Sequence, residues 1–120
     1  MAEAEQVSAV YPFLSVQIRI RDWEQETLAL VDTGFEGSLV IPYAAFNSGL
    51  GNPDTSSNWS LAVGSIVETP VYVGSLEIKG LAAIPDVVIS LLGTDYIMGR
   101  NVIDRFEIIL DHGRTLTIRP

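Results

Sequence analysis

Residues 28–34 read Leu28-Ala29-Leu30-Val31-Asp32-Thr33-Gly34, an apolar run that ends in an acid, a hydroxyl and a glycine. The apolar run is typical of a buried strand, so the carboxylate of Asp32 is expected at a strand end, where it loses part of its hydration. Gly34 allows a tight turn and the close approach of another segment. Two interpretations stay open: a carboxylate that takes part in chemistry, and an Asx-type turn in which Asp32 bonds its own backbone.

The chain on both sides of this turn alternates between apolar and polar residues, which predicts half-buried strands. The clearest alternation is at 14–21, where Leu14 begins the series and Arg21 ends it. Glycine and proline turns separate the segments, and residues 47–58 are expected to form a loop. Residues 94–102 are expected to form a short helix capped by Thr94. The other expected elements are strands at 39–41, 59–63, 66–73, 76–78, 82–92, 106–110 and 116–118, and a helical turn at 43–46.

Many short strands and one short helix predict an all-β fold, closed into a barrel or packed as a sandwich. The length of 120 residues fits one domain. We assign residues 14–120 to that domain and residues 1–13 to an N-terminal extension.

Composition excludes several classes of function. An apolar fraction of 48% supports a sizeable core, and a net charge of −8 argues against a nucleic-acid partner. The chain has no cysteine and one histidine, His112, so we expect no disulfide, no metal site and no cofactor. Residues 1–10 carry no basic residue, and no apolar run approaches the ~20 residues of a membrane span. We therefore expect a cytoplasmic protein without a membrane partner.

A second segment, Ile89-Ser90-Leu91-Leu92-Gly93-Thr94-Asp95, is also an apolar run that reaches a glycine. Alone it predicts a strand that leads into a helix. Together with the turn at Asp32 it makes two apolar strands that each end in a glycine-containing turn, one of which bears an aspartate.

This combination resembles the retropepsin-like aspartic proteases, the single-domain relatives of pepsin found in retroviruses, bacteria and archaea. The likeness runs from Leu14 to Ile118. It implies an acid-protease-like, closed β-barrel that works as a homodimer. With Phe35 after the triplet, the motif resembles that of a prokaryotic subgroup whose sequence at this place is Asp-Thr-Gly-Phe. The matching stretches are 29–34, Leu39-Val40-Ile41-Pro42, 91–95 and the closing hairpin at 106–118.

The resemblance implies a role for each matching residue. Asp32 of each chain is the catalytic residue, Thr33 interlocks the two turns, and Gly34 presents its carbonyl to the substrate. A flap is implied to fold over a bound peptide; its tip is placed near the first of two Gly-Ser turns, 64–65 and 74–75, and the choice between them stays open. Phe35, Glu36, Val63, Gly64 and Ser65 are the implied substrate-binding residues, and Leu92, Gly93 and Asp95 form the implied structural loop behind the site, with Gly93 packed behind the turn.

Retroviral members usually carry Gly-Arg after the second apolar pair, and the arginine braces their dimer. In this chain the matching glycine is Gly93 and the next residue is Thr94. We therefore do not expect that arginine pairing in the same form. Phe35 and Glu36 also differ from the Ala and Asp of retroviral members, and Phe35 is expected to crowd the site.

Peptide hydrolysis needs a base that activates water and an acid that protonates the leaving nitrogen. Two carboxylates about 3 Å apart share one proton and supply both groups. One chain has one such triplet, so the expected enzyme is an aspartic endopeptidase that acts on peptides or proteins as a homodimer. Two alternatives stay open: a non-catalytic dimeric module that binds extended peptide by strand addition, and a domain whose second aspartate or closed flap comes from another chain.

Other residues with reactive or bulky side chains have structural interpretations. His112 precedes Gly113 in an expected hairpin turn, and the chain has no Gly-x-Ser-x-Gly motif to make a serine nucleophile. Trp23 and Trp59 are expected to pack, and Trp59, just before the flap, is also a candidate for substrate contact.

Overall fold

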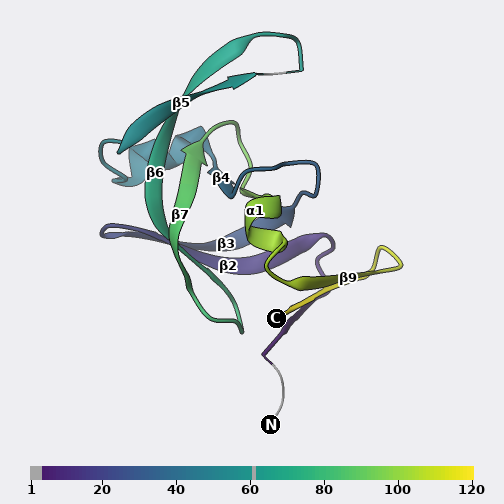
Figure 1. The fold of residues 1–120 in the computed structure, drawn as a ribbon. Coiled ribbons are helices and arrows are strands. Elements are labelled where there is room, and N and C mark those ends of the chain that lie inside the picture. Colours follow the sequence, from purple (N-terminus) through teal and green to yellow (C-terminus); the bar gives the residue numbers. More distant parts are fainter. Residues whose placement is uncertain (1–3, 61) are drawn as a thin grey trace.

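The computed structural model describes residues 4–60 and 62–120. Within them the regular secondary structure is mainly β-strand, with two short helices, which confirms the all-β prediction (Figure 1). The strands are β1 (Gln6–Ser8), β2 (Phe13–Ile20), β3 (Trp23–Val31), β4 (Leu39–Ile41), β5 (Thr55–Ser60), β6 (Ile66–Ile78), β7 (Ile84–Leu91), β8 (Ile97–Met98), β9 (Glu107–Asp111) and β10 (Thr115–Arg119), and the helices are a 3₁₀ helix, η1 (Tyr43–Ser48), and α1 (Arg100–Ile103).

Six strands close into a barrel. Their order is β2-β3-β8-β4-β7-β6, and β6 pairs back to β2, with Ile78 opposite Val16 and Leu76 opposite Ile18. The strand pattern left a barrel and a sandwich open, and the closed barrel implied by the resemblance is confirmed. β5 continues the sheet beyond β6 at its edge, so the β5–β6 hairpin rises from the barrel (Figure 1).

The core consists of the inward-facing residues of these strands. In β2 the four apolar residues of the alternating series, Leu14, Val16, Ile18 and Ile20, are each at most 2% exposed. Each such burial stabilises the fold by about 1.5–3 kcal/mol. The fully buried ring of Tyr72 completes the core, and its hydroxyl donates a hydrogen bond to the carbonyl of Gly51 at 2.7 Å.

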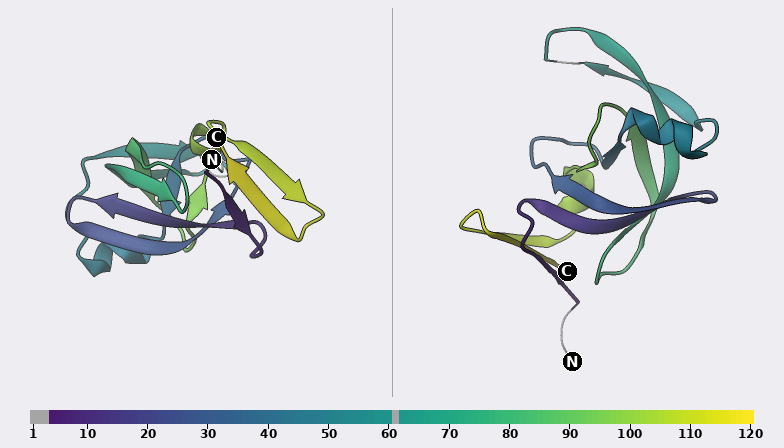
Figure 2. Two further views of the ribbon diagram at one scale, coloured as in Figure 1. Left: turned by 90° about the horizontal axis from the view of Figure 1, so that it is seen from below. Right: turned by 180° about the vertical axis from the view of Figure 1, so that it is seen from behind.

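A second sheet, in the order β1-β10-β9, lies beside the barrel and ends in the projecting β9–β10 hairpin (Figure 2). β1 belongs to the residues assigned to an N-terminal extension, and it pairs with β10 through Gln6 opposite Ile118. The side chain of Gln6 also exchanges two hydrogen bonds with the backbone of Ser15. These contacts tie β1 to both sheets.

Three local predictions are wrong. Residues 55–58 are not loop: they begin β5, because pairing with β6 outweighs their polar composition. Gly74-Ser75 is not a turn but an irregularity within the continuous strand β6. The helix starts at Arg100 instead of Thr94, since residues 97–98 pair with β3 and β4. The turn of the β5–β6 hairpin therefore includes Gly64 and Ser65.

Asp54 fixes the base of the β5–β6 hairpin. Its carboxylate accepts hydrogen bonds from the N–H of Val73 at 3.0 Å and from Arg21 at 2.9 Å. These two bonds hold the pKa of the Asp54 carboxyl below its ordinary value of 3.8. The Arg21 guanidinium also lies 5.7 Å from the centre of the Tyr72 ring, so the same network reaches the core.

This network predicts a pH-dependent contribution to stability. Because the pKa of Asp54 is lower in the folded than in the unfolded chain, the stabilisation is complete above about 3.8 and is lost as the pH falls through the folded value. We expect Asp54→Asn to lower the urea midpoint at pH 6, and the difference from the parent to shrink below pH 3.8. Urea unfolding from pH 2 to pH 7 measures both. A difference that stays constant with pH would contradict the assignment.

Within residues 4–60 and 62–120, no helix has the length and apolar character needed to cross a membrane.

Candidate active site

Asp32 directly follows β3 and begins the loop of residues 32–38, called here the Asp32 loop. The run 28–31 was expected to be a buried strand, but only Ala29 is buried: Leu30 and Val31 are half-buried and Leu28 is 44% exposed. Asp32 itself is half-buried. Its N–H donates to the carbonyl of Met98 at 3.0 Å, and its Oδ1 accepts from the N–H of Gly34 at 2.9 Å. The Asx-type bond is thus present. By fixing one carboxylate oxygen it orients the whole group, which is compatible with chemistry at the other oxygen.

The Asp32 loop is held by the backbone that joins β8 to α1. The N–H groups of three successive residues, 99–101, donate to the carbonyls of Ser38, Phe35 and Gly37 at 2.9, 2.8 and 3.2 Å. The side-chain amide of Asn101 adds a bond to the hydroxyl of Ser38 at 2.7 Å. Four hydrogen bonds therefore fix the loop from one side.

Gly99 is the glycine that packs behind the turn. A Cβ at this position would lie 2.2 Å from the carbonyl oxygen of Gly37 and 2.5 Å from the Phe35 ring. A Cβ at Gly93 would meet nothing within 4 Å, so the packing role predicted for Gly93 is wrong. Gly93 instead has a φ of +69°, in the left-handed region that favours glycine.

Arg100 follows Gly99 and pairs with Glu36 of the Asp32 loop, Nη2 to Oε1, at 2.9 Å. The chain thus does contain a Gly-Arg pair after two apolar residues, Ile97 and Met98, which the sequence analysis missed. Both charged side chains are well exposed, so the pair contributes at most about 1 kcal/mol. The missed signal is the short apolar-apolar-Gly-Arg sequence itself.

A cavity of about 300 Å³ opens beside Asp32 and is called here the Asp32 cavity. Leu92, Gly93 and Asp95, which were predicted to form the structural loop behind the site, line this cavity. Trp59 of β5 closes it on the hairpin side. The other lining residues are Phe35, Val40, Thr94 and Ile97.

The remaining predicted substrate-binding residues lie in two places. Phe35 and Glu36 line a shallow hollow of about 430 Å³ together with residues 58–60, called here the outer hollow. Val63, Gly64 and Ser65 lie in the turn of the β5–β6 hairpin and are exposed, and the lining of the Asp32 cavity does not include them. The hairpin turn lies on the same side of the barrel as the Asp32 loop (Figures 1 and 2).

Thr33 is exposed and faces away from the Asp32 cavity. It lines a different cleft of about 320 Å³, called here the Thr33 cleft. The walls of this cleft are largely apolar and include Ile103 at the end of α1, Phe106, and Ile108 and Leu110 of β9. Asp32 and Thr33, which are adjacent in one turn, therefore line two different hollows: the Asp32 cavity and the Thr33 cleft.

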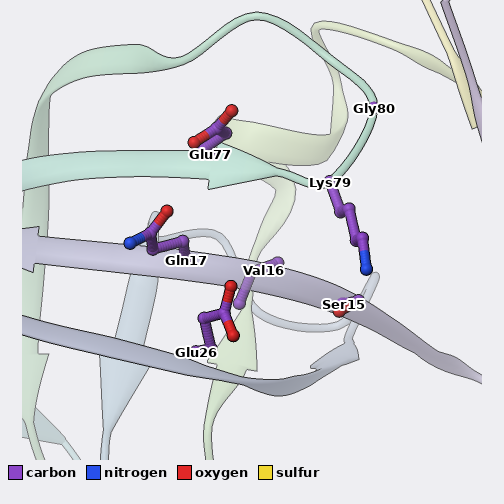
Figure 3. Close-up of a pocket in the computed structure, with 7 residues that line it drawn as sticks. All are labelled: Ser15, Val16, Gln17, Glu26, Glu77, Lys79 and Gly80. Atoms are coloured by element: carbon purple, nitrogen blue, oxygen red, sulfur yellow. The ribbon is translucent and has the colours of Figure 1, made fainter.

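A further pocket, of about 140 Å³, lies on the outside of β2, β3 and β6, away from Asp32 (Figure 3). Gln17 stands there between Glu26 and Glu77, its neighbours on the two adjacent strands. Across the described part of the chain, no three histidine, aspartate or glutamate side chains gather closely enough to hold a metal ion.

No family model matches this chain. No curated protein matches it either. Among solved structures, the chain is similar to a retropepsin-like aspartic protease from Rickettsia conorii, with a TM-score of 0.67 and 14% sequence identity. The match covers 98% of this chain and 91% of that chain. At this identity the likeness shows the fold: the whole barrel, and not a fragment of it, has the retropepsin-like arrangement.

Proposed function

We propose that this chain is an aspartic endopeptidase that acts as a homodimer, with one Asp32 from each protomer in a shared active site. The observation that carries the proposal is the setting of Asp32. Its carboxylate is oriented by Gly34, its loop is fixed by residues 99–101, and it borders a cavity that Trp59 of the β5–β6 hairpin also lines. The similarity in fold to a retropepsin-like aspartic protease supports the same conclusion.

The proposed chemistry uses two carboxylates that share one proton. The ionised carboxylate takes a proton from a water molecule, whose oxygen attacks the carbonyl carbon of the peptide bond. The protonated carboxyl donates its proton to the carbonyl oxygen, which gives a tetrahedral gem-diol. Proton transfer to the nitrogen then breaks the carbon–nitrogen bond and releases an amine and a carboxylic acid.

The second protomer is proposed to lie on the side of the Thr33 cleft. A two-fold axis beside the turn would bring both copies of Asp32 together and place each Thr33 against the partner. The exposed apolar residue Leu110, 52% accessible, borders this cleft on β9. Burial of such residues would favour association.

A mixing experiment tests the shared site. Wild-type chain and Asp32→Asn chain are allowed to exchange subunits, and cleavage of unfolded β-casein is measured. With a three-fold excess of the variant, about one wild-type chain in four finds a wild-type partner, so activity per wild-type chain is expected to fall to about a quarter.

The matched control is an excess of Asp95→Asn chain, whose exposed carboxylate lines the same cavity. It should leave the activity of the wild-type chains undiminished. Activity that is unaffected by the Asp32→Asn chain would refute a shared site. Binding of β-casein without cleavage by either chain would favour the non-catalytic dimeric peptide-binding module.

A further inference from the structure

One side-chain contact joins the β5–β6 hairpin to the Asp32 loop. The rings of Phe35 and Trp59 lie with their centres 5.4 Å apart and their planes inclined by 36°. Phe35 comes directly after the Asp-Thr-Gly turn, and Trp59 lies near the end of β5. This distance is typical of a favourable aromatic pair.

Phe35 is the fixed member of the pair. Its ring covers Gly37, where a Cβ would lie only 2.4 Å from it, and it also packs on Gly99. Its carbonyl accepts the hydrogen bond from the N–H of Arg100, and its own N–H donates to the carbonyl of Asp32 at 3.2 Å. The position of the ring is therefore set by the same contacts that hold the Asp32 loop.

Trp59 is the member on the less constrained segment. β5 is the edge strand of its sheet, and every residue of β5 except Trp59 is exposed. The base of the hairpin is fixed by Asp54, but Trp59 lies close to the hairpin turn, opposite Val67 of β6. Segments with few buried contacts open at low free-energy cost, so a single contact has a large effect on the position of the hairpin.

The pair also lies between two hollows. Phe35 and Trp59 both line the Asp32 cavity, and both line the outer hollow. The two rings are therefore a wall shared by both hollows.

We propose that Phe35 and Trp59 form an aromatic clasp that holds the β5–β6 hairpin against the Asp32 loop, and that a peptide reaches Asp32 only when this clasp opens. The second part rests on the function proposed above, and the first part does not. A peptide then binds the fraction of molecules with an open clasp, so loss of the contact accelerates association. An aromatic pair of this kind corresponds to a change of about 2- to 10-fold.

The first experiment contains no peptide. Trp23→Phe leaves Trp59 as the single tryptophan, and acrylamide quenching then reports its exposure. We expect Phe35→Leu to increase the quenching and shift the emission to longer wavelength. The amide hydrogens of β5 should exchange faster by about 2- to 10-fold. Phe35→Tyr, which keeps a ring, and Phe46→Leu, which removes an exposed ring of η1, should change neither.

A second pair of variants guards against damage to the Asp32 loop. Trp59→Leu should accelerate amide exchange in β5 as Phe35→Leu does, while Trp59→Phe should restore the slow exchange. Amide exchange that stays at parental values in both Leu variants, with unchanged quenching in Phe35→Leu, would overturn the clasp.

The second experiment tests access. In the Asp32→Asn background, unfolded β-casein should associate about 2- to 10-fold faster with the Phe35→Leu chain than with its parent. Equal association rates would overturn the role of the clasp in access. Failure of β-casein to bind any of these chains would count against the proposed function, while the peptide-free measurement decides the clasp by itself.

Discussion

Asp32→Asn is expected to lower the rate of peptide hydrolysis by a factor of about 10³ or more, because a positioned acid–base group contributes about 10²–10⁴-fold and the variant removes it from both halves of the site. Asparagine keeps an Oδ1 that accepts the hydrogen bond of the Gly34 N–H, so the turn should survive. The amide can neither take a proton from water nor donate one to the carbonyl oxygen. Rates on unfolded β-casein between pH 4 and 7, with the unfolding midpoint measured alongside, test this expectation.

The informative control is Asp95→Asn. Asp95 lines the same cavity and carries the same charge, but it is exposed and lies beyond β7, away from the Asp-Thr-Gly turn. We expect its replacement to leave the rate close to the parental value, because an exposed charge contributes little through solvent. Equal cleavage by Asp32→Asn and the parent would mean that Asp32 serves only the turn.

Gly99→Ala is expected to have the largest effect on stability. The backbone of Gly99, with φ −102° and ψ −179°, is open to any residue, so the cost comes from the methyl group alone. That group would lie 2.2 Å from the Gly37 carbonyl oxygen, and backbone on both sides leaves little room to move. Such overpacking costs about 1–3 kcal/mol or more, and here it also displaces the Asp32 loop. We therefore expect a lower urea midpoint and loss of activity together.

Gly93→Ala is the matched control because the packing role predicted for Gly93 is observed at Gly99. Its methyl group would meet nothing within 4 Å, and the only cost is the positive φ of +69°. That cost is about 1–2 kcal/mol. A larger loss of stability and activity in Gly93→Ala than in Gly99→Ala would show that the turn is packed by residue 93 after all.

The strands of the barrel were predictable because their information is local, whereas closure depends on the distant pairing of β2 with β6. In β2 the burial of side chains alternates over eight residues, and every buried position holds an apolar residue. The setting of Asp32 was predictable for the same reason, since the apolar run of β3 and the glycine of the turn are adjacent in the sequence. Its Asx-type hydrogen bond was also among the stated possibilities.

The choice between Gly93 and Gly99 was not predictable in this way. Both follow two apolar residues; the arginine after Gly99 is the one local difference in its favour, and the contact with the Asp32 loop itself is not local. The answer depends on β8, whose two residues pair with β3 and β4 across about 60 positions of the chain. Likewise, the Gly74-Ser75 pair predicts a turn, but Gly74 lies within β6 and lets this strand pass close to the backbone of Arg19. A Cβ at Gly74 would lie 2.3 Å from the Arg19 carbonyl oxygen.

The hydrogen bonds from residues 99–101 to the Asp32 loop have a consequence for the order of events during synthesis. A ribosome makes Asp32 long before it makes Gly99, and β2 cannot close the barrel until the end of β6 has emerged. Until residues 99–101 have also emerged, the Asp32 loop of the nascent chain lacks the backbone N–H groups that hold it. Pairings this distant in sequence form late and slowly. The sequence separation of these parts thus delays assembly of the site until most of the chain has been made.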